Sequence, residues 1–215
     1  MKTVLLLLTM VATLLATIGE VTAIHGTAKL HHQATQLTVE KGLGVNIEDL
    51  LVTEQASKVQ VILHDNTIVT IGPNSEYLFE RYEEGDHAEI AMVLQKGFFK
   101  IITGKIGKIS PQRFKVKTKS AVIGIRGTQF MALVNDNEEK IGCSKGQISV
   151  TTLEKIYALQ KGEMLIYQNN QWHKEQLDVK SFSPQAIKPN KKQKAERIDN
   201  YSFMPGLENN DVRQE

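Results

Sequence analysis

The sequence predicts an all-β domain, and three observations support that expectation. Short segments between residues 26 and 167 alternate apolar and polar side chains, the period of a half-buried strand. Turn-forming residues separate these segments at short intervals. The composition, 41% hydrophobic and 23% charged over 215 residues, is that of a globular chain long enough for one domain with a real core. About a dozen short strands at this spacing indicate an antiparallel two-layer sandwich or a solenoid-like β-roll of stacked hairpins.

The first half of the chain contains two tight turns between alternating segments. Asp65-Asn66 separates two of these segments by two residues, which predicts a hairpin, and residues 72–75 form a second turn. A polar loop follows at residues 83–87. The strands expected here are Gly26–Leu30, Gln36–Glu40, Leu51–Thr53, Lys58–His64, Thr67–Ile71 and a segment with Tyr77 and Phe79 on one side.

The second half continues the same pattern. A turn at residues 95–97 is expected to separate two strands, and lysines alternate with apolar residues from Phe114 to Lys119. The remaining expected strands are Ile90–Leu94, Phe98–Ile102, the segment around Ile148 and Val150, Ile156–Gln160 and Met164–Tyr167.

The run AVIGIRGTQFMALV, from Ala121 to Val134, joins two apolar strands through a glycine-rich corner. Ala121–Gly124 is apolar without alternation, which predicts a strand covered on both faces. Gly124 and Gly127 flank Ile125-Arg126, and glycines inside a strand indicate a bulge or a sharp bend. Between apolar strands the Arg126 guanidinium is expected to be partly buried and structural, with nearby carbonyls, Glu76 or Glu80 as candidate partners.

This run resembles the signature of the FecR family, in which a basic strand leads through a small apolar run to Arg-Gly-Thr-x-Phe. The Leu-His-Asp-Asn-Thr and Ile-Gly-Pro-Asn-Ser segments after Ile62 and the later Leu-Gln-Lys-Gly also match family motifs, with Asn66 where the family has glycine. Asparagine accepts the same left-handed turn conformation. The resemblance covers residues 24–167 and implies an all-β domain. The motif residues, to which it gives a structural role, are Gly72, Pro73, Asn74, Ser75, Gly97, Gly124, Arg126, Gly127, Thr128 and Phe130.

The two ends of the chain differ from the domain. Residues 1–23 read as a secretory signal, with Lys2 before an apolar run that is too short for a typical transmembrane helix. The expected organisation is a signal helix removed near Ala23, a FecR-like domain over residues 24–178, and a mobile basic tail over residues 179–215. This predicts a periplasmic protein that touches a membrane only through an uncleaved signal or weak contacts of the tail.

The motifs predict no catalytic, cofactor or metal site. The six histidines are scattered without a nucleophile motif, and Cys143 is expected to be a small buried hydrophobe. A net charge of +2, without a nucleic-acid-binding motif, argues against nucleic acid as a partner. The basic strand of Lys115, Lys117 and Lys119 is a candidate binding face for an anionic group, and equally a guard against sheet aggregation.

The resemblance to the FecR family implies a non-catalytic periplasmic module, here without the anti-sigma segment of the FecR regulators, that binds another envelope protein or takes part in envelope signalling. The alternative from a different class is a protein that binds or modifies carbohydrate or the cell wall. A structural envelope protein that assembles through strand edges is a third hypothesis. An exposed apolar edge favours the first or third, whereas acids held in a concave face favour the second.

Overall fold

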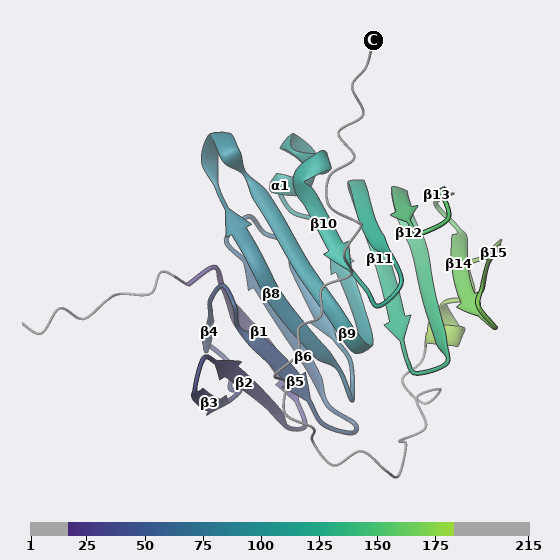
Figure 1. The fold of residues 1–215 in the computed structure, drawn as a ribbon. Coiled ribbons are helices and arrows are strands. Elements are labelled where there is room, and N and C mark those ends of the chain that lie inside the picture. Colours follow the sequence, from purple (N-terminus) through teal and green to yellow (C-terminus); the bar gives the residue numbers. More distant parts are fainter. Residues whose placement is uncertain (1–16, 183–215) are drawn as a thin grey trace, which may run out of the picture.

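The computed structural model describes residues 17–182, and these form one fifteen-stranded sheet (Figure 1). The all-β prediction is therefore confirmed. The expected signal helix lies outside the described residues except for its last part, and so does the expected tail from residue 183 on. Within the described residues no helix is long and apolar enough to cross a membrane.

Eight strands precede the first long strand, and seven strands complete the sheet. The first eight are β1 Gly19–His25, β2 Ala28–His32, β3 Thr35–Thr38, β4 Gly44–Val45, β5 Leu50–Thr53, β6 Lys58–Leu63, β7 Ile68–Ile71 and β8 Glu76–Glu83. The others are β9 Glu89–Ile102, β10 Phe114–Lys117, β11 Val122–Val134, β12 Glu138–Thr151, β13 Ile156–Gln160, β14 Glu163–Gln168 and β15 Gln171–Gln176. Short helical turns connect them at η1 Gly85–His87, α1 Ile106–Ile109 and η2 Pro111–Arg113, and η3 Val179–Phe182 follows the last strand.

Three long strands, β9, β11 and β12, change their neighbours along their length. The first half of β9 pairs with β8 and β10, whereas its second half pairs with β7 and β11. The first half of β12 likewise pairs with β14 and its second half with β13. The sheet thus folds over these strands into two layers, which combines the sandwich and the roll that the sequence left open. One layer runs β4-β1-β6-β7-β9-β11-β12-β14-β15, and the other runs β3-β2-β5-β8-β9-β10-β11-β12-β13.

The sheet is mixed, and the expectation of a purely antiparallel sheet was wrong at one pair. Strand β10 runs parallel to β9. A parallel neighbour requires a crossover connection, and the segment between these strands, with α1 and η2, provides one. The turn expected at residues 95–97 was also wrong, because β9 continues through it. Gly97 has φ of 95°, a backbone conformation that is unusual within a strand and that glycine adopts easily, so the strand continues through this position.

The main core lies between the two layers. Tyr77 of β8 contacts Phe99 of β9 with ring centroids 5.8 Å apart, and Phe99 contacts Phe130 of β11 at 5.6 Å. All three rings are fully buried. Tyr77 belongs to the layer of β8, whereas Phe99 and Phe130 lie on paired strands of the other layer, so the Tyr77–Phe99 contact joins the two layers.

A second, smaller core covers the outer face of one layer. Met131 and Leu133 of β11 pack there with side chains of β14 and with Phe182 of η3. The part of β11 that is covered on both faces is therefore residues 130–134. The prediction that Ala121–Gly124 is this segment was wrong, since Val122 and Gly124 remain partly exposed.

Strand β1 was not expected, because its residues were assigned to the end of the signal. It pairs with β6 along its length and with β4 at its start. Ile18, just before it, and Val21 within it are buried in the main core. The N-terminal part of the described chain is thus built into the sheet.

Candidate functional site

The glycine-rich corner of β11 is the bend at which that strand passes from one layer to the other. Its pairing with β12 shifts register between Arg126 and Gln129, and Gly127 has φ of 58°. The expected bulge is therefore present. A β-branched or large residue at Gly127 would be strained in this conformation.

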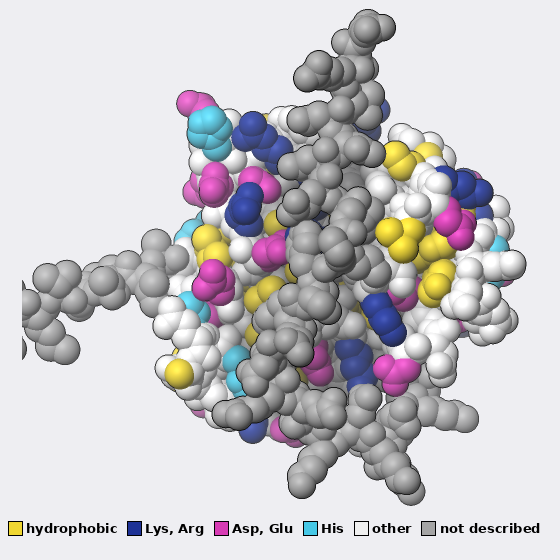
Figure 2. Space-filling view, in the orientation of Figure 1, with side chains coloured by type: hydrophobic (Ala, Val, Ile, Leu, Met, Phe, Trp, Pro, Cys, Tyr) yellow, Lys and Arg dark blue, Asp and Glu magenta, His cyan; other side chains and the backbone are white. Residues whose placement is uncertain are grey.

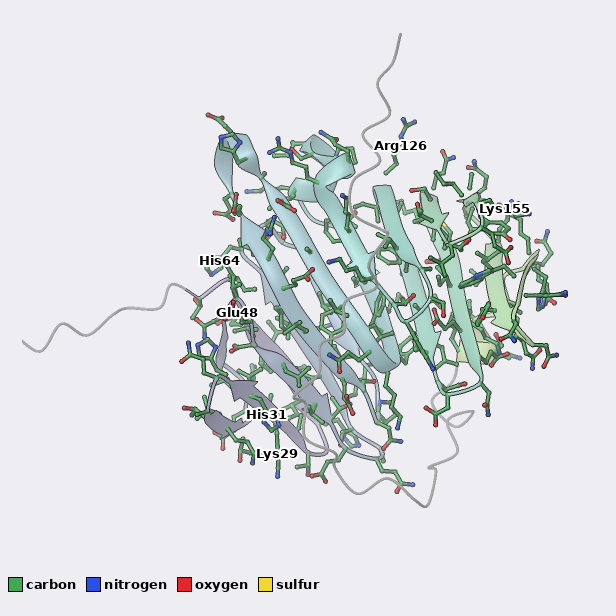
Figure 3. All side chains as sticks on the ribbon, in the orientation of Figure 1. Lys29, His31, Glu48, His64, Arg126 and Lys155 are labelled. Atoms are coloured by element: carbon green, nitrogen blue, oxygen red, sulfur yellow. The ribbon has the colours of Figure 1, made fainter. Side chains whose placement is uncertain are left out.

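Arg126 lies at this bend and points away from the ribbon (Figure 3). Its side chain is exposed, and no hydrogen bond or ion pair joins it to another described residue. The predicted partial burial was wrong, because at the apex of a bent strand the side chain has no covering layer. Glu80, an expected partner, instead accepts a bond from Lys117.

The residues that follow Arg126 do hold the corner together. The amide of Thr128 donates to Thr103 Oγ1 at 2.9 Å, and that hydroxyl donates back to the Thr128 carbonyl at 3.1 Å. Phe130 lies in the main core. Gly124 faces Ser149 of β12 so closely that a methyl group there would meet the serine hydroxyl at 2.7 Å.

The other motif residues meet around the hydroxyl groups of Ser75 and Thr53. Phe98 N donates to Ser75 Oγ, and Ser75 N donates to Thr53 Oγ1, both at 2.9 Å. Thr53 Oγ1 donates to the carbonyl of Gly72 at 2.6 Å, and Ser75 Oγ donates to that of Pro73 at 3.2 Å. Asn74 takes φ of 51° in this turn, and a side chain at Gly97 would overlap Ser75. This arrangement connects β5, β8 and β9.

A buried carboxylate, Asp65, was not singled out from the sequence. Its Oδ1 accepts a bond from Thr67 N at 2.8 Å, and its Oδ2 accepts bonds from Thr67 Oγ1 at 2.9 Å and Ile106 N at 3.1 Å. Asp65 is 2% exposed. The Asp-x-Thr spacing at the hairpin is the signal that could have identified it, since such an aspartate commonly bonds the amide two residues on. Asn66 between them has φ of 67°, the left-handed conformation expected for it.

The basic strand presents its lysines on an outer face of the sheet. Phe114 and Val116 of β10 are buried, so the alternating lysines point outward. Lys115 and Lys119 are exposed. Lys117 Nζ is 3.1 Å from Glu80 Oε1, and this ion pair reduces the positive charge available to an anion on that face.

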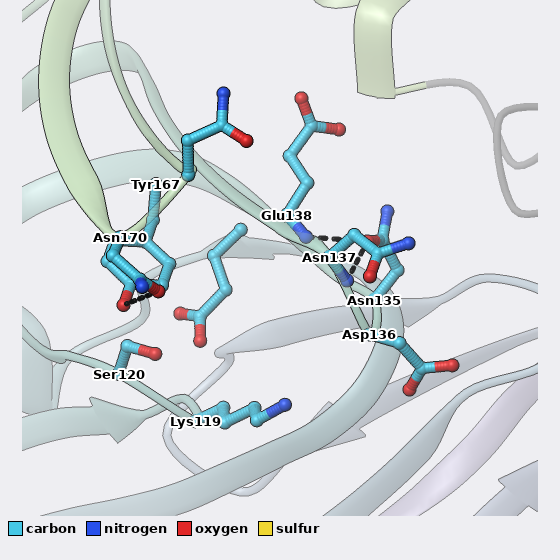
Figure 4. A pocket seen from close by; sticks show the side chains of 10 residues that line it. Lys119, Ser120, Asn135, Asp136, Asn137, Glu138, Tyr167 and Asn170 are labelled. Carbon is cyan, nitrogen blue, oxygen red and sulfur yellow. Dashed lines mark hydrogen bonds between the residues drawn. The ribbon is translucent and has the colours of Figure 1, made fainter.

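A polar pocket of about 490 Å³ lies where three turns meet (Figure 4). The turns are those between β10 and β11, between β11 and β12, and between β14 and β15. The residues that line it are Lys119, Ser120, Asn135, Asp136, Asn137, Glu138, Glu139, Tyr167, Asn169 and Asn170. Because β11 bends at Arg126, both of its ends reach this pocket. Of the predicted binding residues, only Lys119 lies here.

Glu139 is the buried charged group of the pocket, with 2% of its surface exposed. Thr118 Oγ1 donates to its Oε2 at 2.8 Å, whereas Oε1 is buried without a hydrogen bond that meets ordinary geometry. Burial raises the pKa of this carboxyl, and the nearby Ser120 counteracts only part of the rise. The sequence reasoning missed this pocket, because its three turns are far apart in the chain.

Asp49 and Cys143 are further buried ionisable groups of the described chain. Within residues 17–182, no three His, Cys, Asp or Glu side chains are placed to hold a metal ion. His32 Nδ1 lies 2.6 Å from Oδ1 of the fully buried Asp49. Cys143 is buried as expected, and burial raises the pKa of its thiol, which disfavours the reactive thiolate.

Comparison with known proteins gives one family-model match and a shared fold. The family model described as FecR protein matches residues 49–149. Two crystal structures of a protein assigned as an anti-sigma factor in Parabacteroides distasonis ATCC 8503 match with TM-scores of 0.52 and identities of 19% and 18%. In each case 61% of this chain and 61% of the other are covered, so the similarity shows a shared fold. A comparison with curated protein sequences finds no match.

Proposed function

We propose that this protein is a non-catalytic module of the cell envelope that acts in signalling by binding another protein, because the FecR family model matches residues 49–149. The family match supports a regulatory role, and the neighbours assigned as anti-sigma factors share the fold. The apolar N-terminal run supports export to the periplasm with removal of a signal near Ala23.

The observation that carries the proposal is an apolar edge of β13 with which no other described strand pairs. This strand pairs with β12 on one side, whereas β15 covers only β14. Leu153, in the turn before β13, and Ile156, its first residue, are 73% and 68% exposed. Figure 2 shows hydrophobic side chains exposed on the side of the molecule that carries β12 and β13. An unpaired edge beside exposed apolar side chains is a template for another chain.

Two side chains already occupy part of this edge. Lys174 Nζ donates to the carbonyl of Ala158 at 3.0 Å, and Gln160 N donates to Glu163 Oε2 at 2.6 Å. These bonds show that alternate residues of β13 direct their backbone groups away from β12. By the same alternation Ile156 points its amide and carbonyl outward. The beginning of β13 is therefore the part that can accept a strand.

We expect the partner to contribute an extended segment that pairs with β13 and buries Leu153 and Ile156. Strand addition of this kind takes affinity from main-chain hydrogen bonds and specificity from pockets for alternate side chains. Glu163 and Lys174, which bond backbone groups at the other end of β13, would then limit the length of the added strand.

The experiment places a photoreactive side chain at Ile156 and, as a matched control, at Ile109 of α1, which is also 68% exposed. Irradiation of intact cells should give a discrete crosslinked species from position 156 and none from position 109. Ile156→Lys should also weaken partner binding, whereas Ile109→Lys should not. Equal crosslinking at both positions, or none at position 156, would contradict binding at this edge.

A further inference from the structure

The polar pocket at the meeting of the three turns carries an inference that does not rest on strand addition at β13. Its acids come from the start of β12 and the turn before it, whereas Asn169 and Asn170 come from the turn between β14 and β15. Both asparagines have positive φ, 52° and 61°, so two successive residues take a conformation that few side chains other than asparagine tolerate. The turn keeps two carboxamides at the pocket.

The unpaired oxygen of Glu139 indicates that the pocket lacks a donor. Buried polar atoms in folded proteins nearly always have a hydrogen-bond partner, and an exception calls for a reason. Thr118 donates only to Oε2, and Glu139 Oε1 has no hydrogen bond of ordinary geometry within the described residues, although Ser120 lies near the carboxyl group. A ligand that brings a hydroxyl group would supply the missing donor.

The neighbouring groups exclude several classes of ligand. Asp136, Glu138 and Glu139 outnumber Lys119, so an anion would be repelled. Glu138 is already paired with Lys140 at 3.1 Å, and no three acids in the described chain are placed to hold a metal ion. An apolar ligand would leave the many polar groups of the lining unsatisfied.

A neutral, hydroxyl-rich ligand fits the remaining groups. Carboxamides both donate and accept hydrogen bonds, which matches a ring of hydroxyl groups. Tyr167 supplies an aromatic surface, and its ring is held against Trp172 with centroids 4.8 Å apart at 40°. Its hydroxyl is bonded to Asn170 Oδ1 at 3.3 Å (Figure 4). The volume of about 490 Å³ is within the range of small-molecule sites.

We propose that this pocket binds a neutral saccharide, in which a sugar hydroxyl donates to Glu139 and the apolar face of a sugar ring packs on Tyr167. The site thus combines polar side chains that bond sugar hydroxyl groups with one aromatic ring on which the sugar packs. In an exported protein, such a site would attach the module to the glycan of the envelope, while the β13 edge stays open to a protein.

The single tryptophan of the chain, Trp172, provides the readout, because its ring lies against that of Tyr167. The full chain is titrated with cellobiose, with N,N′-diacetylchitobiose and with maltose, while tryptophan fluorescence is followed. We expect a saturable change with at least one disaccharide. Glu139→Gln should weaken that binding about tenfold, since the amide replaces an acceptor by a donor. Glu163→Gln, which lies outside the pocket lining, should leave it unchanged.

A second variant guards against a folding defect in the first. Asn137 is exposed at the rim of the pocket, and Asn137→Ala should weaken binding without changing the thermal unfolding of the protein. No saturable change with any of the three sugars overturns the proposal, and so does sugar binding that Glu139→Gln leaves intact. A saturable response to calcium chloride alone would assign the pocket to a cation instead. Crosslinking from position 156 tests the strand edge separately.

Discussion

Asp65→Ala is expected to be one of the most destabilising single changes outside the apolar core. The carboxylate accepts bonds from the amides of Thr67 and Ile106 and from the Thr67 hydroxyl, at 2.8 to 3.1 Å. The hydroxyl can turn toward another acceptor, but the two amides would remain buried and unpaired. At about 2 kcal/mol for each unsatisfied buried donor, the loss is about 4 kcal/mol of unfolding free energy. Asp65→Asn keeps one acceptor oxygen and should cost about half as much.

Urea unfolding followed by circular dichroism measures this loss. With a slope of about 2 kcal/mol per molar urea, Asp65→Ala should lower the midpoint by about 2 M. The control is Asp86→Ala, because Asp86 is an exposed acid in η1, and its midpoint should move by less than about 0.3 M. A loss below about 1 kcal/mol for Asp65→Ala would refute the idea that this carboxylate joins the β6–β7 hairpin to α1.

Four other substitutions test separate parts of the structure. Arg126→Ala should cost less than about 1 kcal/mol in thermal unfolding, because the guanidinium is exposed, and a loss above about 3 would restore a buried role. Ala56→Gly should stabilise the protein by about 0.5–1 kcal/mol and raise its melting temperature, since Ala56 has φ of 58°, a conformation that glycine adopts with less strain. A lower melting temperature would count against this. Glu139→Gln should stabilise the protein at neutral pH and have little effect in acid. Burial raises the pKa of Glu139, so the stability of the unsubstituted protein falls as pH rises from the ordinary glutamate pKa through the raised one. Glu163→Gln should behave in the opposite way, because the hydrogen bond with Lys174 lowers the pKa of Glu163: this variant should lose stability at neutral pH, and the loss should disappear as pH falls through that lowered pKa. Urea unfolding at several pH values measures the stability of both variants, and parallel pH profiles would contradict the argument.

The strands were predictable because their alternation is local. The Asp65–Asn66 hairpin, the buried Cys143 and the bulge at Gly127 all follow from neighbouring residues, and each is present. The reading of Gly97 as a turn failed, since one glycine with positive φ serves equally for a turn or for a bulge in a continuous strand.

The candidate sites depend on long-range pairing, which the sequence does not show. Glu139 stands in an acidic run that looks like any solvated turn, and it becomes buried only because the bend in β11 returns Thr118 to its side. Arg126 presents the reverse case. It is bordered by apolar residues along the chain, yet the same bend leaves it at an apex without a covering layer.

Because β1 belongs to the sheet, the position at which a signal peptide is cleaved would decide whether the sheet is complete. Cleavage after Ala23 would remove most of a strand that lies between β4 and β6, together with the buried Val21. Strand β4 pairs only with β1, and β6 would then present an unpaired ladder beside a gap in the core. Such a groove is the receptor half of donor-strand complementation, in which another polypeptide inserts the missing strand. A cut a few residues earlier would leave β1 in place and the sheet complete. A small shift of the peptidase site therefore separates a module with a complete sheet from one that needs a strand from another polypeptide.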